Sequence, residues 1–254
     1  MAERIDTLKF LGTAGARFVM IKQLRHSGGL WLSAKNTSVL IDPGPGSLVR
    51  CLSSRPKLEP SALDGIIITH RHLDHCNDVN VMIEAMTNGG FTKRGVVFCP
   101  GDAIDKDPVI FEYLRGFAEK IGILHEREKF TVGSVKFETS MRHIHPAETY
   151  GLKFKLNGRS VGLMSDTRYF DALGTFYKVH TLILPVVFPQ IMPAIDHLSL
   201  EEAKVLISEC KPERAILTHF GMRMLKAKPR IMAQTLSDAL GIEVIAATDG
   251  LTIT

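Results

Sequence analysis

The chain has 254 residues, of which 45% are hydrophobic and 23% are charged. This composition is ordinary for a soluble globular protein, and it excludes disordered, collagen-like and coiled-coil chains. Lys and Arg number 31 against 27 Asp and Glu, and the resulting formal charge of +4 permits an anionic partner without requiring one.

Short β-rich segments recur from one end of the chain to the other. Gly, Pro, Asn or Asp bounds each of them, as is typical of strands. Asn157 and Gly158, between two such segments, predict a tight hairpin. In chain order, we expect strands at residues 8–11, 30–33, 38–41, 65–69, 96–99, 135–139, 150–156, 160–164, 181–187, 215–218 and 243–247.

Three segments have helical periodicity. Apolar residues recur with a period near 3.6 in residues 107–121, which predicts a helix there. Ser199 and Glu202 form a capping-box pattern at the start of a second helix, which Pro212 stops, and a third helix is expected over residues 229–240. Many strands with few helices between them indicate an α/β chain with two stacked sheets flanked by helices, in one domain covering residues 1–254.

The sequence also indicates where the protein works. Its four cysteines are scattered without a C-x-x-C pair, which argues against a disulfide framework and against a thiolate zinc site. The amino-terminal segment contains Glu3 and has no apolar core, unlike a signal peptide. The longest apolar stretch, residues 182–188, is too short to span a bilayer. We therefore expect a cytoplasmic protein without a membrane segment.

A cluster of metal-binding side chains follows the apolar strand that ends near Thr69. Since side chains alternate along a strand, His70 and His72 point the same way and can chelate one ion. If a helix begins after them, Asp74 and His75 can face a second ion. Imidazoles and carboxylates without thiolates suit zinc, manganese or iron in an open, catalytic site. The alternative is a polar loop whose histidines bond only to the main chain.

The string H-R-H-L-D-H at residues 70–75 resembles the H-x-H-x-D-H motif of the metallo-β-lactamase superfamily of binuclear hydrolases. Other motifs of that family follow in order between residues 8 and 251, each at the end of an expected strand. The resemblance implies a four-layer αββα sandwich of two mixed β-sheets and two divalent ions, zinc before manganese or iron. It implies that Asp42 orients the ligand loop. The implied ligands are His70, His72 and His145 for one ion, Asp74, His75 and His219 for the other, and Asp166 between them.

Two histidines compete for the third ligand position. His145 matches the family spacing to Tyr150 and Gly151 better than His143 does, so we expect His145 to be the ligand. The other histidine is then an ordinary loop residue with its hydrogen bonds satisfied.

Residues 196–203 resemble the segment that supplies a proton to the leaving group in ribonuclease Z-like members of the superfamily. The resemblance implies that His197 acts with Asp74 as a catalytic residue; the alternative is that His197 only helps to start the following helix. The chain departs from bacterial ribonuclease Z between His145 and Asp166, where residues 146–165 leave room for one hairpin and none for a tRNA-gripping arm. Processing of tRNA 3′ ends is therefore in doubt.

Together, these features predict a phosphodiesterase in which a hydroxide bridging two ions attacks and His197 protonates the leaving oxygen. The alternatives are a lactone or other ester hydrolase, a ribonuclease Z-like RNA endonuclease, and a metal-binding module without activity. We expect a small anionic or nucleotide-like substrate, with RNA less favoured, no membrane, and a homodimer as one use of the apolar loop at 188–195. Four arginines near the ligands could bind phosphate or pair with surface acids: Arg71, Arg142, Arg168 and Arg223.

Overall fold

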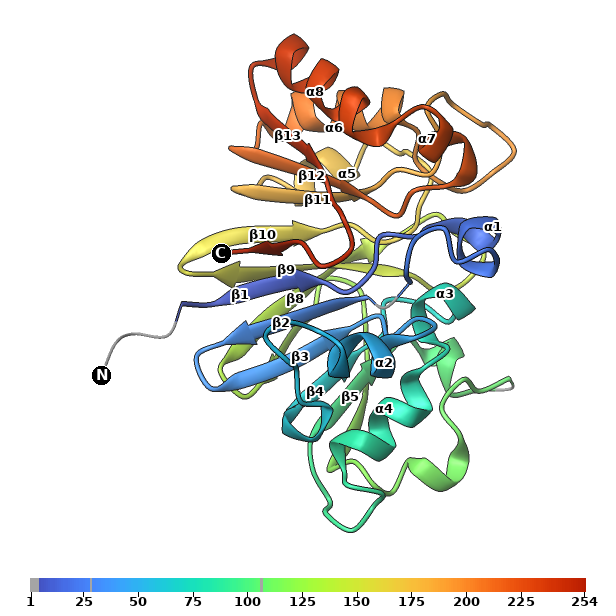
Figure 1. Cartoon of the computed structure of the whole chain (residues 1–254), viewed down its shortest axis with the longest axis vertical. Coiled ribbons are helices and arrows are strands. Elements are labelled where there is room, and N and C mark those ends of the chain that lie inside the picture. The colour runs from blue at the N-terminus through green and yellow to red at the C-terminus, as the bar shows by residue number, and fades with distance from the viewer. Residues whose placement is uncertain (1–4, 28, 106) are drawn as a thin grey trace.

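A computed structural model describes residues 5–27, 29–105 and 107–254, and it contains two seven-stranded mixed sheets (Figure 1). The first sheet has the order β14-β1-β2-β3-β4-β5-β6, antiparallel from β14 to β3 and parallel from β3 to β6. Its strands are β1 (Thr7–Phe10), β2 (Leu30–Ala34), β3 (Thr37–Ile41), β4 (Gly65–Ile67), β5 (Val96–Cys99), β6 (Lys120–Ile123) and β14 (Thr252–Ile253).

The second sheet repeats this plan with the next part of the chain. Its order is β13-β12-β11-β10-β9-β8-β7, antiparallel from β7 to β10 and parallel from β10 to β13. Parallel neighbours need crossover connections, and the chain places its longer helices there. The strands are β7 (Lys129–Val132), β8 (Val135–Arg142), β9 (Tyr150–Leu156), β10 (Arg159–Leu163), β11 (Thr181–Pro185), β12 (Arg214–Thr218) and β13 (Glu243–Ala246).

Helices lie on the outer faces of both sheets. Figure 1 shows α2, α3 and α4 beside the first sheet and α5 to α8 beside the second. No helix in the described ranges is long and apolar enough to cross a membrane. The helices are α1 (Ala16–Ile21), α2 (Ser47–Leu52), α3 (Leu73–Cys76), α4 (Val79–Met86), α5 (Leu173–Phe176), α6 (Leu200–Cys210), α7 (Met222–Lys226) and α8 (Pro229–Leu240), with 3₁₀ turns at Pro60–Ala62, Gly101–Ala103 and Glu112–Leu114.

Three buried apolar clusters hold these layers together. The largest lies between the sheets and joins Phe10 and Leu32 of the first to Phe154 and Ile183 of the second. A second cluster packs β11 and β12 against α6 and α8, and a third packs β3 to β5 against α4. Helix, sheet, sheet and helix therefore form four layers, which confirms the αββα sandwich expected from the sequence.

Two local predictions are confirmed at the level of hydrogen bonds and dihedral angles. The Ser199 hydroxyl accepts from the Glu202 main-chain N–H at 3.2 Å, and the Glu202 carboxylate accepts from the Ser199 N–H at 2.8 Å, which closes the capping box. Asn157 and Gly158 link β9 to β10 with φ of 49° and 82°, the pattern of a type I′ turn.

Replacement of Gly158 by alanine is expected to lower the free energy of unfolding by about 1 kcal/mol, because a Cβ at positive φ is strained. A Cβ there would meet no atom within 4 Å, so the backbone alone accounts for the effect. Urea unfolding measures it. A variant as stable as the natural chain would contradict the assigned turn.

The helix predicted over residues 107–121 is wrong. The described part of that segment contains a 3₁₀ turn, Glu112–Leu114, and the start of β6. The apolar pattern of residues 107–121 matches burial in part. Ile110 and Leu114 are buried, but Phe111 and Tyr113 are exposed. The Arg115 guanidinium donates to the Ile110 carbonyl at 3.2 Å, so a side chain satisfies a group that a helix would have satisfied. Pairing of β6 with the edge of β5 then outweighs local helical propensity.

Candidate metal centre

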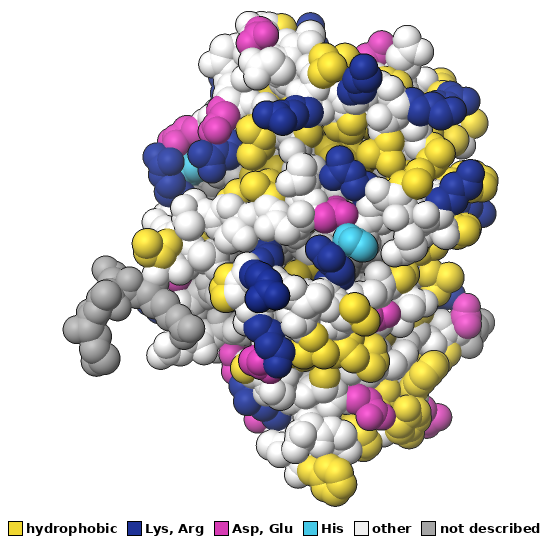
Figure 2. Space-filling view, viewed as in Figure 1, with side chains coloured by type: hydrophobic (Ala, Val, Ile, Leu, Met, Phe, Trp, Pro, Cys, Tyr) yellow, Lys and Arg dark blue, Asp and Glu magenta, His cyan; other side chains and the backbone are white. Residues whose placement is uncertain are grey.

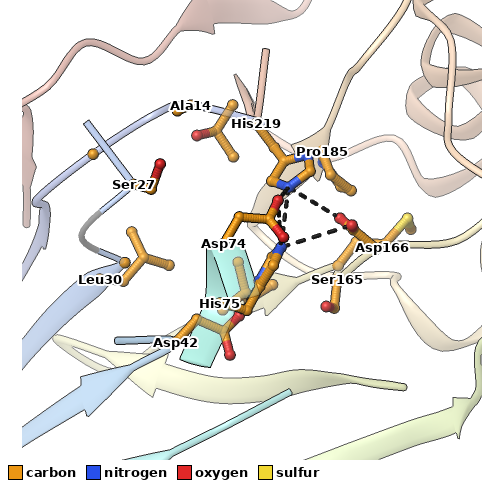
Figure 3. Close-up of a pocket in the computed structure, with 15 residues that line it drawn as sticks. Ala14, Ser27, Leu30, Asp42, Asp74, His75, Ser165, Asp166, Pro185 and His219 are labelled. Atoms are coloured by element: carbon orange, nitrogen blue, oxygen red, sulfur yellow. Dashed lines mark hydrogen bonds and ion pairs between the residues drawn. The ribbon is translucent and has the colours of Figure 1, made fainter. Parts of the chain in front are cut away.

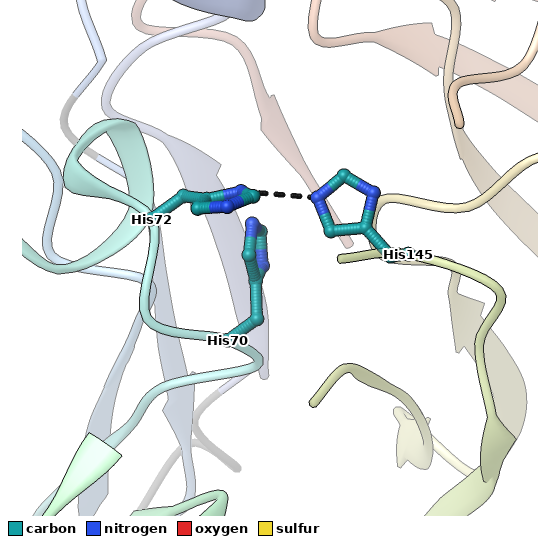
Figure 4. Close-up of side chains that lie close together, drawn as sticks. All are labelled: His70, His72 and His145. Carbon is teal, nitrogen blue, oxygen red and sulfur yellow. Dashed lines mark hydrogen bonds between the residues drawn. The ribbon is translucent and has the colours of Figure 1, made fainter. Parts of the chain in front are cut away.

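Three histidines form the first group of converging side chains (Figure 4). His70 and His72 lie on the segment between β4 and α3, and His145 follows β8. The Nε2 atom of His145 is 3.0 Å from Nδ1 of His72. The ring of His70 lies 4.8 Å from that of His72 and 5.1 Å from that of His145, measured between centroids. The sequence predicted that His70 and His72 would lie together, which is confirmed, but β4 ends at Ile67 and both lie on the irregular segment after it rather than on a strand. The fold adds His145.

Two carboxylates and two histidines form the second group (Figure 3). Helix α3 begins directly after His72, and its first turn carries Asp74 and His75. The Nε2 atom of His219, which follows β12, is 3.0 Å from Nε2 of His75 and 3.3 Å from Oδ2 of Asp74. Asp166 completes the group from the end of β10.

The Asp166 carboxylate lies between the two groups and is 1% exposed. Its Oδ2 atom is 3.8 Å from Nε2 of His70 and 3.9 Å from Nε2 of His145, on one side. On the other side it is 3.7 Å from Nε2 of His75, while Oδ1 is 3.4 Å from Nε2 of His219. A carboxylate in this place can serve both groups, which is the position the sequence resemblance implied.

Neighbouring acceptors orient the rings from outside. The Asp42 carboxylate accepts from Nδ1 of His75 at 2.9 Å, and the Asp196 main-chain carbonyl accepts from Nδ1 of His145 at 3.0 Å. The Thr69 hydroxyl, which itself donates to Asp42, lies 3.3 Å from Nδ1 of His70. Once each Nδ1–H is bound on the outside, each Nε2 lone pair faces inward, as in metal-binding histidines.

Backbone conformation at two of these residues is unusual. Asp42 and His219 have φ of 53° and 58°, in the left-handed region that non-glycine residues rarely adopt. A Cβ at Gly15 would overlap the main chain and ring of His219, so the loop after β1 packs directly against that histidine. Strained residues held by close packing cluster at functional sites.

Burial and charge act strongly on the titratable groups. Burial lowers the pKa of His70 well below its usual range. Burial also opposes the charged form of His75, but the carboxylates of Asp74, Asp166 and Asp42 outweigh it and raise the pKa of His75. Burial opposes ionisation of Asp166 too, yet the surrounding His219, His197 and His75 hold the pKa of Asp166 well below its usual value. The Asp166 carboxylate is therefore ionised at neutral pH.

The side chains present fit metal ions. Nε2 of His70 and Oδ1 of Asp166 are buried without a hydrogen-bond partner, which costs free energy unless another group satisfies them. In each group two ring nitrogens approach to 3.0 Å. Two nitrogens on one tetrahedral zinc ion, each at about 2.0–2.1 Å, lie about 3.3 Å apart, close to the separation seen here. Imidazole and carboxylate donors without a thiolate match the sequence expectation.

The remaining candidates lie at different distances from the centre. Nδ1 of His197 is 3.5 Å from Oδ2 of Asp166, so His197 borders the centre outside both groups. Both ring nitrogens of His143 are directed elsewhere, to the Asp166 carbonyl and the Tyr177 hydroxyl, so His145 rather than His143 joins the cluster. Burial lowers the pKa of His143 to about 4.

Two of the four arginines pair with acids, which is one of the two roles that we considered. Arg71 pairs with Asp107, and Arg168 lies 3.3 Å from the Asp196 carboxylate, so these two bind acids. Arg223 contacts the sulfur of Met192 at 3.3 Å, and Arg142 is exposed at the end of β8.

The sequence resemblance named Asp42 as an orienting residue, and Asp42 does accept from His75, but sequence reasoning missed the other groups that orient the rings. Thr69 and the Asp196 carbonyl act through positions that carry no signal in the sequence, since a hydroxyl next to a motif or a main-chain oxygen could belong to any loop.

Comparison with known proteins gives consistent matches. The model of the beta-lactamase superfamily domain matches residues 37–220. An uncharacterised protein of Methanocaldococcus jannaschii is 29% identical over 96% of this chain and 93% of its own. The structure of YhfI, a metallo-β-lactamase fold protein from Bacillus subtilis, has a TM-score of 0.81 at 20% identity, covering 98% of this chain and 99% of that one. A diphosphatase of the PhnP family has a TM-score of 0.72 at 19% identity, covering 98% and 97%.

Proposed function

Because the chain belongs to the metallo-β-lactamase superfamily of metal-dependent hydrolases, we propose that it cleaves phosphodiester bonds with two divalent cations, preferably zinc. The observation that carries the proposal is the position of His197. This imidazole lies 3.5 Å from Asp166 yet belongs to neither ligand group. A phosphodiester with a poor leaving group needs a proton donor at such a place.

In this proposal, His70, His72 and His145 would hold one cation and Asp74, His75 and His219 the other, with the Asp166 carboxylate available to both groups. Divalent cations held there would lower the pKa of water and neutralise charge on the attacked group. Asp42, Thr69 and the Asp196 carbonyl fix the ring orientations, so the centre is preorganised before a substrate arrives.

His197 is the most accessible imidazole bordering Asp166. Its side chain is 17% exposed, whereas that of His145 is 2% exposed. Its main-chain N–H donates to the Ile195 carbonyl, and the loop end is tied to β11 by the bond from Val187 to Leu198. The ring is therefore held at the edge of the centre, where it can give a proton to a leaving oxygen.

Arg223 is the arginine that we propose for contact with a substrate phosphate. It is exposed, four residues after His219, and its polar contact is a thioether sulfur. Sulfur is a weak acceptor, so a phosphate oxygen can replace it at little cost.

Two features make RNA the less favoured substrate. The described segment between His145 and Asp166 folds into the β9–β10 hairpin with its two-residue turn, as predicted. On the face of the molecule shown in Figure 2, Lys and Arg side chains are spread from one end to the other, with Asp and Glu side chains between them. Neither feature provides the continuous basic groove that steep salt dependence of RNA binding would require.

The proposal is tested by metal analysis followed by a substrate panel. We expect two zinc ions per chain, loss of phosphodiester cleavage after chelation, and recovery when zinc is restored. The panel contains a dinucleotide, a p-nitrophenyl phosphodiester and a lactone. Cleavage of the dinucleotide that survives removal of both metals would contradict the proposal, and turnover of the lactone alone would favour the ester-hydrolase alternative.

We also propose a cytoplasmic location. The support is that Cys51, Cys76, Cys99 and Cys210 are all buried free thiols, as in proteins of reducing compartments.

A further inference from the structure

His143 and Tyr177 form a buried pair behind the metal centre. His143 follows β8 and is 2% exposed, and Tyr177 follows α5 and is fully buried. Nδ1 of His143 is 3.2 Å from the main-chain carbonyl of Asp166, and Nε2 is 3.0 Å from the hydroxyl of Tyr177. Neither residue belongs to the two ligand groups.

The hydrogen bonds specify one protonation state of His143. A carbonyl oxygen can only accept, so Nδ1 carries the proton and donates it to the Asp166 carbonyl. In the neutral imidazole Nε2 is then the acceptor, and the Tyr177 hydroxyl donates to it. Every polar atom of the two side chains is satisfied in this single arrangement, which holds the imidazole in one orientation.

The second sheet leaves a slot for the phenol ring. A Cβ at Gly151 of β9 would overlap the Tyr177 hydroxyl, and a Cβ at Gly162 of β10 would lie 2.9 Å from the ring. Tyr177 therefore sits directly on the two strands that lead to the ligand segments, and its hydroxyl is placed by the sheet itself.

The two ligand segments are joined at this point. Besides the His143 bond, the Ile144 N–H donates to the Thr167 hydroxyl at 3.2 Å, and the Arg168 N–H donates to the Ile144 carbonyl at 3.1 Å. Three hydrogen bonds thus tie residues 143–145 to residues 166–168. His145 ends the first segment and Asp166 begins the second.

We propose that His143 and Tyr177 are positioning residues that hold the Asp166 main chain in register with His145, so that the bridging carboxylate and the third histidine meet the same cation. This inference rests on the metal centre of the proposed function. It assigns a role to a histidine that the ligand groups leave out.

The test measures zinc affinity, by competition with a chromophoric chelator, in Tyr177→Phe, His143→Asn and His143→Leu. Tyr177→Phe and His143→Asn keep a donor for the Asp166 carbonyl but lose the bond between the two side chains, and each should weaken binding about 10-fold. His143→Leu loses both bonds and should weaken binding about 100-fold. The tenfold advantage of asparagine over leucine is the rescue that a packing role would not give.

Tyr150→Phe is the matched control. It also removes a hydroxyl from a buried tyrosine, but that hydroxyl donates to Glu148 at 2.7 Å and not to a residue beside the centre. Zinc affinity in this variant should equal that of the natural chain. Thermal unfolding of the metal-free variants shows whether Tyr177→Phe and Tyr150→Phe lose comparable stability.

Affinities of Tyr177→Phe and His143→Leu within about twofold of the natural chain would overturn the positioning role. A natural chain that binds neither zinc, manganese nor iron would instead overturn the proposed function, and the ¹⁵N shifts of the His143 ring then decide the inference. A single Nδ1–H tautomer that is lost or shifted in Tyr177→Phe supports it, and a mixture of tautomers in the natural chain overturns it. If Tyr177→Phe does not fold, the two His143 variants carry the comparison.

Discussion

Replacement of His72 by alanine is expected to reduce metal-dependent phosphodiester hydrolysis by more than about 100-fold, because groups that merely orient ligands already account for about 10–100-fold in metal affinity or activity. His72 is the N-cap residue of α3 but makes no side-chain capping bond, so its removal does not unfold the helix start. Initial rates with a dinucleotide, together with zinc content, measure the effect.

The geometry makes a sharper version of this experiment possible. His72 faces His145 through Nδ1, whereas the other histidines of the two groups face Asp166 through Nε2. Asparagine presents a polar atom at the Nδ1 position and glutamine presents one further out, so His72→Asn should retain more zinc than His72→Gln. His125→Ala, at an exposed histidine outside the centre, serves as the control. Full activity of His72→Ala would remove His72 from the ligand set.

The metal-binding motif at residues 70–75 could be predicted from the sequence because its side chains are close together along the chain. His70 and His72 lie on the short irregular segment between β4 and α3, and Asp74 and His75 lie on the first turn of α3. Closeness in sequence therefore placed one pair in each of the two groups, although His70 and His72 are not on a strand as expected. The family resemblance then supplied His145, Asp166 and His219, which arrive from strands far away along the chain.

Groups that act through long-range contacts could not be read in this way. The carbonyl of Asp196 reaches His145 across 51 positions, and Tyr177 reaches His143 across 34. The sequence around His143 does not predict a tyrosine partner, and the motif spacing that favoured His145 does not predict the role of His143. Both pairs depend on contacts between segments that follow different elements of the second half of the chain, which local sequence does not reveal.

Edge strands show the same limit in the fold itself. β6 and β7 have few residues and mixed burial, so their propensity is weak and their pairing with β5 and β8 decides them. The apolar spacing of residues 107–121 satisfies a helical template, yet the chain uses those residues to cover α4 and to reach the sheet edge. The one-domain prediction stays a prediction.

Removal of the His197 imidazole is expected to slow cleavage of an alkoxide leaving group by about 10²–10⁴-fold, the usual contribution of a general acid. A p-nitrophenolate leaving group is stable as an anion and needs no proton, so the same variant should lose far less with a p-nitrophenyl phosphodiester. Comparison of kcat/KM for a dinucleotide and for the nitrophenyl substrate measures the difference. Equal losses with both would mean that His197 has another role.

A matched variant separates proton donation from a role in starting α6. Ser199→Ala removes the capping box, which should cost about 1 kcal/mol of stability, but it leaves the His197 ring beside Asp166. We therefore expect it to be less stable and equally active at a temperature well below unfolding. Loss of dinucleotide cleavage in Ser199→Ala to the level of His197→Ala would support the helix-start alternative.

The pH dependence tests the same role from a different side. Burial lowers the pKa of His197 to about 4, while the Asp166 carboxylate acts in the opposite direction, so the imidazole is mostly neutral at pH 7. At pH values above this pKa, the protonated fraction of His197 rises about tenfold for each unit by which the pH falls. Although other groups titrate as well, dividing the rate of the natural chain by that of His197→Ala cancels their effect. For the dinucleotide this ratio should be larger at pH 6 than at pH 8, and for the nitrophenyl substrate it should stay nearly constant, because only the alkoxide needs the proton.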